Sequence, residues 1–213
     1  MQSEVRVRAG MTTLAPSRYD FDPVHHIHKI DGIEVPGTSA IFKSLGVIDD
    51  RFYNESARMR GQVVHACCHY LAEGDLNWDT VDASVVGYVR GYEKCLLDTG
   101  FQPERCETPT PNFNLLYATI PDQEGLIKKD RGVMEFKTGS MMPWTAIQTA
   151  FQVMALWPED YLTKFRIGVE LHPDGTYRAQ WFDDSNDFNI AQAMVGAYWW
   201  KRIYLNGGKT NGK

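Results

Sequence analysis

A stretch in which charged and apolar residues alternate, from residue 117 to 139, restricts the fold of this chain more than any other feature. It reads YATIPDQEGLIKKDRGVMEFKTG, and the polar run at 128–132 predicts the turn of a β-hairpin. Glu135 and Lys137 lie two apart on the returning strand, so their side chains point to one face, while the apolar residues beside Glu135 point into the core. Antiparallel pairing then brings Asp122 back opposite Glu135 and Lys137.

Two carboxylates that converge at the end of a sheet repel each other unless a cation lies between them. Mg²⁺ and Mn²⁺ are the ions expected in such a site because they prefer oxygen ligands. A bound divalent ion lowers the pKa of its water and holds a phosphate oxygen, and a neighbouring ammonium can hold or help deprotonate that water. The pattern therefore favours phosphodiester hydrolysis. The alternative is a solvated sheet face, where Asp, Glu and Lys are common.

The order of the residues around the hairpin resembles a known nuclease signature. The dipeptide PD at 121–122, followed by EFK at 135–137, resembles the motif of the PD-(D/E)XK nuclease superfamily. The TG that follows, and a predicted helix that bears Gln148, resemble its RecB-like and phage exonuclease branch. The resemblance covers about residues 25–205.

This resemblance implies roles for individual residues. Asp122, Glu135 and Lys137 would be catalytic, with Lys137 acting on the attacking water. Asp122 and Glu135 would also bind the metal, Mg²⁺ or Mn²⁺, and the backbone carbonyl of Phe136 would add a further ligand.

A helix predicted over residues 55–73, ahead of the hairpin, carries another metal-ligand candidate. Its apolar residues recur at helical spacing, and Gly74 is placed to end it. The spacing from Gly61 to His65 resembles the G-x-x-x-H element of RecB-like nucleases, in which the histidine reaches the metal. An imidazole ligand suits Mn²⁺ better than Mg²⁺. The alternative is a core histidine whose hydrogen bonds are satisfied within the fold.

Two further residues are candidates for the site. Glu107 stands where relatives have a glutamate on the strand before the aspartate, so it is either an additional ligand or an ordinary solvated glutamate. Gln148 matches a family position that guides the DNA strand and is followed, four residues later, by tyrosine. This chain has Gln152 there instead, and Ala118 where relatives usually have glycine.

The remaining pattern predicts an α/β fold. Apolar alternation and turn residues predict hairpins at 25–35 and at 163–182, and apolar periodicity predicts helices at 40–45, 81–99, 143–156 and 183–205. Together with the resemblance, this predicts a restriction-endonuclease-like central mixed sheet of about five strands, flanked by helices and preceded by an N-terminal β-hairpin. We predict a flexible arm at 1–24, a single nuclease domain at 25–205 and a polar tail at 206–213.

Composition restricts cofactors and location. The four cysteines show no CxxC spacing, and none follows the core motif, so we predict neither a zinc site nor the iron–sulfur cluster of some RecB-like relatives. No apolar run is long enough for a bilayer and no signal-peptide segment is seen, so we expect no membrane partner. A cytoplasmic location is expected, in the host cytoplasm if a phage encodes the chain.

The net charge of −5 argues against non-specific coating of nucleic acid. Local basic residues could nevertheless line a DNA groove: Arg51, Arg58, Arg60, Lys128, Lys129 and Arg131.

The predicted function is a divalent-metal-dependent DNA exonuclease acting on single- or double-stranded DNA in phage or bacterial recombination, repair or replication. A recombination or single-strand-binding protein is a candidate partner. The alternatives are an endonuclease of the same family and a catalytically silent nucleic-acid-binding or assembly protein on the same fold. The acidic charge and the missing tyrosine favour the silent protein, whereas retention of Asp122, Glu135 and Lys137 favours the enzymes.

Overall fold

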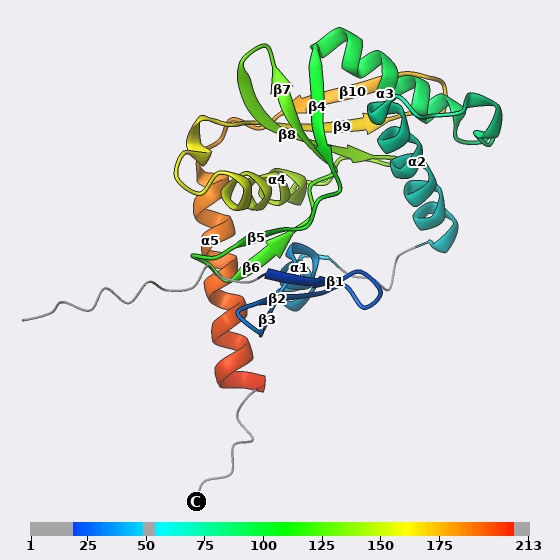
Figure 1. Ribbon diagram of the computed structural model, residues 1–213. Coiled ribbons are helices and arrows are strands. Elements are labelled where there is room, and N and C mark those ends of the chain that lie inside the picture. Colours follow the sequence, from blue (N-terminus) through cyan, green and yellow to red (C-terminus); the bar gives the residue numbers. More distant parts are fainter. Residues whose placement is uncertain (1–18, 49–53, 207–213) are drawn as a thin grey trace, which may run out of the picture.

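A five-stranded mixed sheet forms the centre of the computed structural model, which describes residues 19–48 and 54–206 (Figure 1). The strand order is β10-β9-β8-β7-β4, in which β8 and β9 run parallel and all other neighbours run antiparallel. Its strands are β4 (Phe101–Cys106), β7 (Gln123–Ile127), β8 (Asp130–Lys137), β9 (Phe165–Leu171) and β10 (Tyr177–Trp181). The predicted mixed sheet of about five strands, flanked by helices, is confirmed.

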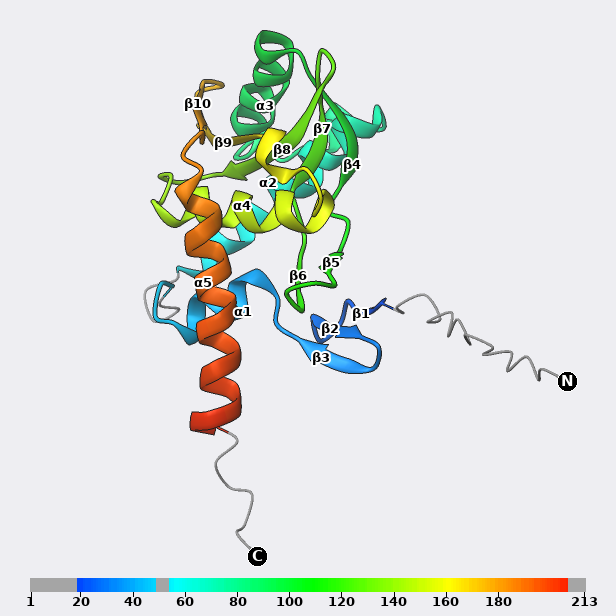
Figure 2. The same ribbon diagram turned by 90° about the vertical axis from the view of Figure 1, so that its left-hand side faces the viewer.

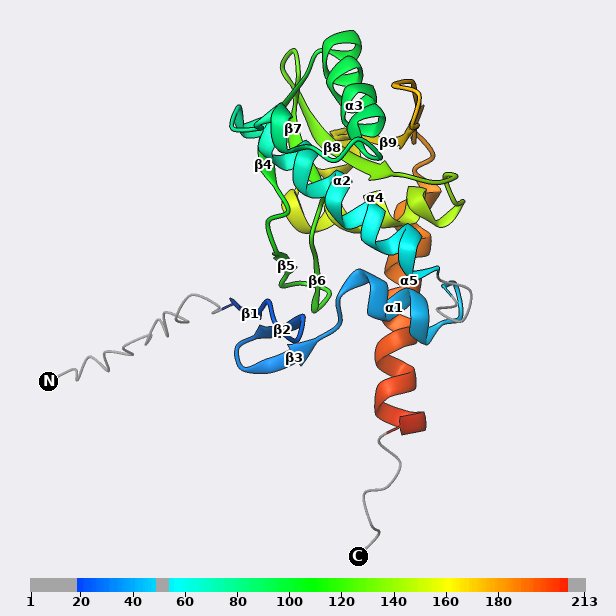
Figure 3. The ribbon, with the colours of Figure 1, turned by 90° about the vertical axis from the view of Figure 1, so that its right-hand side faces the viewer.

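Helices cover both faces of this sheet (Figures 1 and 3). On one face lie α2 (Glu55–Glu73) and α3 (Val86–Thr99), and on the other lie α4 (Trp144–Leu156) and α5 (Asn186–Trp200). Side chains of β8 alternate between two cores, because Met134 and Phe136 pack with α2 and α3, whereas Val133 packs with α4 and α5. The central strand β8 is therefore buried from both sides.

The hairpin predicted around Asp31-Gly32 is present as β2 (Ile27–Ile30) and β3 (Ile33–Val35). Both turn residues have positive φ, 50° for Asp31 and 78° for Gly32, as a tight hairpin turn requires. A third strand, β1 (Tyr19–Asp22), pairs with β2, so the predicted flexible arm is wrong for residues 19–22. Two aromatic residues in β1 explain this pairing, because their rings pack on His28. Residues 1–18 lie outside the described part of the chain.

A small two-stranded sheet joins the N-terminal strands to the rest of the molecule. It consists of β5 (Thr110–Asn112) and β6 (Tyr117–Thr119), and it lies between the N-terminal sheet and the central sheet (Figure 2). Ala118 of β6 is fully buried, and its backbone N–H donates to the carbonyl of Pro36 at 2.9 Å. This contact lies just before α1 (Thr38–Ser44), the short helix predicted at 40–45.

Several boundaries differ from the sequence prediction. Helix α3 begins at Val86 rather than at residue 81, because the Asp82 side chain accepts from the Ser84 N–H and forms a turn there. A 3₁₀ turn, η2 (Trp78–Thr80), precedes it. Another such turn, η3 (Tyr161–Thr163), delays β9 to Phe165.

The segment around Pro103 is more regular than its prolines suggest. It forms β4, an edge strand, and an edge strand tolerates proline because one side of its backbone has no partner strand.

The closing helix packs one face against the core. Phe188, Ala191 and Val195 are buried, and Met194 and Tyr198 pack beside them, whereas Ile190 and Ile203 are exposed. The helix α5 continues as a π-helical segment, η4 (Lys201–Asn206). Its predicted end at Gly207 and Gly208 lies outside the described residues. No helix among the described residues is long and apolar enough to cross a membrane.

Candidate active site

The β7–β8 hairpin brings Asp122 next to Glu135. Gln123 pairs with Met134, so the preceding residue, Asp122, comes opposite Glu135 as predicted. The Asp122 carboxylate is fixed there, because its Oδ2 accepts a hydrogen bond of 2.7 Å from the backbone N–H of Phe136. The Asp122 backbone carbonyl accepts a second bond, 3.1 Å long, from the N–H of Glu107. The aspartate is therefore held to β8 through its side chain and to the segment after β4 through its main chain.

Lys137 and Glu135 lie on the same face of β8, as their spacing predicts. The Lys137 Nζ lies 2.7 Å from Glu135 Oε1 and 3.2 Å from Gln148 Oε1. It also lies 5.1 Å from the centre of the Trp144 ring, within the range of a cation–π contact. Three neighbours thus fix the position of the amine.

Glu135 is more deeply buried than a residue facing an open cleft would be, with only 2% of its surface exposed. Its side chain points toward α4, because that helix covers this face of β8. Gln148 Nε2 donates to Oε1 and Gln152 Nε2 donates to Oε2, each at 2.7 Å. Truncation of Glu135 to alanine would leave these donors without an acceptor, which costs free energy of folding.

Gln152 is the site residue that sequence reasoning missed. We treated it only as a departure from the family pattern. Its spacing of four residues from Gln148 was an available signal, because residues i and i+4 of a helix lie on one face. The same spacing places both amides against Glu135.

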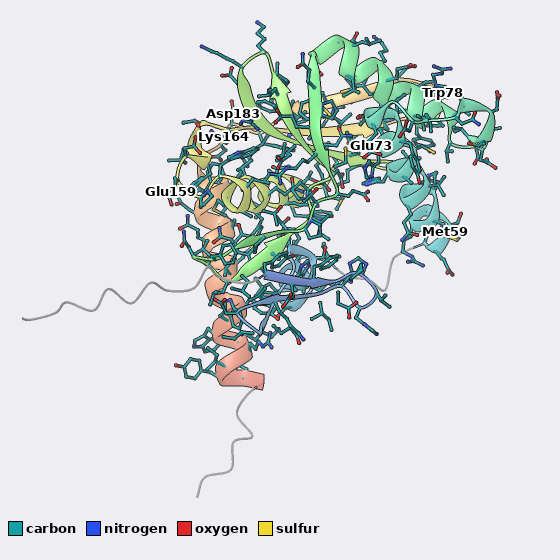
Figure 4. All side chains as sticks on the ribbon, in the orientation of Figure 1. Met59, Glu73, Trp78, Glu159, Lys164 and Asp183 are labelled. Atoms are coloured by element: carbon teal, nitrogen blue, oxygen red, sulfur yellow. The ribbon has the colours of Figure 1, made fainter. Side chains whose placement is uncertain are left out.

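His65 approaches the carboxylates from α2, on the opposite face of the sheet. Its Nδ1 lies 3.3 Å from Asp122 Oδ1 and 3.9 Å from Glu107 Oε1. A Cβ on Gly61 would lie 3.7 Å from Thr138 Oγ1, so α2 passes close to the end of β8, although alanine would also fit. Figure 4 shows the course of α2 from Met59 to Glu73 beside the sheet.

Burial and neighbouring charges shift the pKa values of the site residues in different directions. Burial alone would lower the pKa of His65, but the negative charges of Asp122 and Glu135 outweigh it and raise that pKa to about 9. Burial opposes ionisation of Asp122, yet the charge of His65 holds the pKa of this carboxyl below its ordinary value. For Glu135, burial and the nearby charge of Asp122 raise the pKa in spite of Lys137. Two adjacent carboxyls with opposite shifts are typical of a site that performs chemistry.

The donor atoms fit the divalent metal that the family resemblance implies. Glu135 Oε1 accepts two hydrogen bonds but Oε2 only one, and Asp122 Oδ2 accepts one, so each carboxylate keeps lone pairs for a cation. Carboxylate oxygens, the Phe136 carbonyl and an imidazole form a set suited to Mg²⁺ or Mn²⁺. In the metal-free arrangement, no three His, Cys, Asp or Glu side chains among the described residues are grouped closely enough to hold a metal.

An open groove of about 360 Å³ runs along α2 beside His65. It is lined by Arg58, Gly61, Gln62, His65, Ala66 and Glu107. Glu107 is partly exposed and lies at the edge of the site, where its backbone has a φ of 45°.

The basic residues proposed to line a DNA groove do not gather in one place. Arg60 donates to the carbonyl of Thr138, next to the site. Lys128 and Lys129 form the hairpin turn, which lies roughly 17 Å from Asp122 along the five residues of β7. Arg131, near that turn, pairs with Glu104 at 2.6 Å. A groove shared by all of them is therefore wrong, and Arg51 lies outside the described residues.

The four cysteines are free thiols on α2, α3 and the end of β4. Burial raises the pKa of each of them, to about 11 for Cys106 and about 12 for Cys95. They are therefore protonated at neutral pH and poor nucleophiles.

No protein-family model matches this chain, and a search of curated proteins finds no match to it. Inferences about its function depend on the geometry of the site.

Proposed function

We propose that this protein is a divalent-metal-dependent DNA exonuclease of the PD-(D/E)XK superfamily, in its RecB-like and phage exonuclease branch, with a restriction-endonuclease-like fold. One observation carries this proposal. The hairpin sets Asp122 opposite Glu135, with Lys137 Nζ 2.7 Å from Glu135 and an imidazole from a separate helix 3.3 Å from Asp122. Residues that are far apart in sequence thus lie close together in space, which supports the proposal.

The chain's own groups divide the work of phosphodiester hydrolysis. Asp122 and Glu135 would supply carboxylate oxygens to the ion, and His65 and the Phe136 carbonyl would be the further donors. When bound, a divalent ion would lower the pKa of a water molecule and offset charge on a phosphate oxygen. Lys137 would orient the attacking water by hydrogen bonding, or take its proton as a free amine. Its contacts with Glu135 and Gln148 hold its Nζ at a fixed point for that role.

The exonuclease assignment is tested with end-labelled linear DNA and closed circles, each with Mg²⁺, Mn²⁺ or EDTA. We expect digestion of linear DNA alone, and only with a metal. Lys137→Met and Glu135→Gln should each reduce the rate at least about 100-fold, because the first removes the group that acts on the attacking water and the second removes a metal ligand. Lys128→Met, at the far end of the same hairpin, is the matched control and should digest DNA at the wild-type rate. Undiminished digestion by both site variants, shown to be folded by circular dichroism, would refute the assignment.

A catalytically silent DNA-binding protein is the second candidate. It is favoured by the hydrogen bonds that already engage both Glu135 oxygens and by the net charge of −5. Calorimetry with Mn²⁺ separates it from the enzyme, because a silent protein should give no binding heat that Asp122→Asn removes. Cutting of closed circles would instead identify an endonuclease with the same chemistry.

A further inference from the structure

Gln152 is a polar residue that is fully buried in the core. Its side chain lies on α4 with no exposed surface, at a depth where polar side chains are uncommon. The amide nitrogen donates to Glu135 Oε2 at 2.7 Å. The amide oxygen, Oε1, is buried and has no hydrogen-bond partner among the described residues. One half of the amide is thus satisfied and the other is not.

The orientation of this amide follows from Glu135. A carboxylate oxygen only accepts hydrogen bonds, so the nitrogen of Gln152 must face it, and a flipped amide would place two acceptors together. Burying the unpaired carbonyl costs free energy of folding. A methionine of similar length would fill the space without that cost. The contact to Glu135, rather than the stability of the core, is therefore what glutamine provides here.

This contact acts on the one Glu135 oxygen that has no other donor among the described residues. Oε1 is held by both Lys137 and Gln148, whereas Oε2 is held by Gln152. With Oε1 alone anchored, the carboxylate could still rotate about that point. Gln152, one helical turn after Gln148, fixes the second oxygen and with it the plane of the group.

We infer that Gln152 is a positioning residue that fixes the plane of the Glu135 carboxylate for metal binding. The inference rests on the proposed function, because it takes Glu135 to be a metal ligand. Gln152 itself needs no contact with the ion or with DNA. Hydrogen-bond partners of metal ligands typically change metal affinity or activity about 10- to 100-fold when they are removed.

The first test measures Mn²⁺ affinity by calorimetry and thermal stability by calorimetric melting. For Gln152→Met we expect the Mn²⁺ dissociation constant to rise about 10- to 100-fold, measured at a temperature at which the melting curve shows the variant to be folded. Thr149→Val is the matched control, because Thr149 is fully buried on the same helix and donates to the Ala146 carbonyl. Its Mn²⁺ affinity should remain that of the wild type. Unchanged affinity in Gln152→Met overturns the inference.

A second test needs no metal. Crystal structures of the metal-free wild type and Gln152→Met should show one Glu135 conformer in the first and a rotated or split carboxylate in the second. An identical, single conformer in both overturns the inference. If the wild type binds no Mn²⁺ at all, the proposed function fails, and these two structures still decide whether Gln152 positions Glu135.

Discussion

Each carboxylate of the candidate site has its own cation. His65 lies beside Asp122, and Lys137 contacts Glu135, on opposite faces of the sheet. A buried carboxylate is tolerated when a counter-charge and hydrogen bonds replace its water, and it becomes costly when the counter-charge is removed. Substitutions of the two cations will therefore lower stability, whatever their effect on the proposed hydrolysis. Assays of such variants have to be made below the melting temperature of each variant.

His28 leads to a prediction about pH at the residue scale. Its ring is buried in the N-terminal sheet, with Nδ1 2.7 Å from the Tyr19 hydroxyl. Burial, with a smaller contribution from His26, lowers its pKa below the ordinary value of 6.5. The unfolded chain therefore binds a proton more readily than the folded sheet does. The stability that His28 contributes is fully present above pH 6.5 and is lost as the pH falls through its lowered pKa.

Amide hydrogen exchange of β1 to β3 measures this effect. After correction for intrinsic rates, protection should be lower at about pH 5 than at about pH 7.5. His28→Gln should remove most of the difference, whereas substitution of the exposed His25 should leave it in place. Equal protection at both pH values would show that His28 does not control this sheet.

At the scale of elements, a buried ion pair joins three of them. Arg166 of β9 lies 2.8 Å from Asp187 of α5 and also donates to the carbonyl of Ala146 in α4. Asp187→Ala should reduce the free energy of unfolding by about 3–5 kcal/mol, because it leaves a buried guanidinium without its counter-charge. Urea denaturation measures the change. The double variant Arg166→Met with Asp187→Leu should recover most of the loss, and a double variant as unstable as the single one would contradict this explanation.

The sequence predicts best those helices and strands whose ends are determined by residues at the ends themselves. Helices α2 and α3 end at Gly74 and Gly100, both with positive φ, and the hairpins after β2 and β9 turn at Gly32 and Gly175, which also have positive φ. The meeting of Asp122 with Glu135 follows from the period of a strand and the position of one turn. The start of α3, the strand β1 and the buried face of α5 depend on side-chain contacts between distant segments. Local patterns do not contain that information.

The same distinction applies to the candidate site. The relation of Glu135 to Lys137 is local, because two positions on one strand share a face. The burial of Glu135 and the contact of Gln152 depend instead on where α4 packs against β8. A helix that covers this face of β8 changes Glu135 from solvated to enclosed, and the sequence of β8 alone does not show that the helix is there.

At the scale of the whole molecule, the distribution of charge determines where the proposed DNA substrate can bind. The net charge of −5 gives no general attraction to DNA, so binding has to depend on cations near the groove. Arg58 lines that groove, with 55% of its side chain exposed and only a loose ion pair, 3.8 Å long, to Glu55. The exposed pair contributes little and leaves the guanidinium able to contact phosphate. Lys128 and Lys129, at the opposite end of the hairpin, are too far from the groove to do so.

Arg58→Gln should therefore weaken DNA binding, and Lys128→Gln with Lys129→Gln should not. The affinity falls as the salt concentration rises. Each phosphate contact that is lost makes the slope of log affinity against log salt shallower by about 0.9 on duplex DNA. Fluorescence anisotropy of labelled DNA over a range of KCl concentrations, without a divalent metal, measures both affinity and slope. The two lysine substitutions reduce the positive charge more than Arg58→Gln does, so a net-charge effect would make the lysine variant the weaker binder. That result would contradict a direct contact of Arg58 with DNA in the groove beside His65.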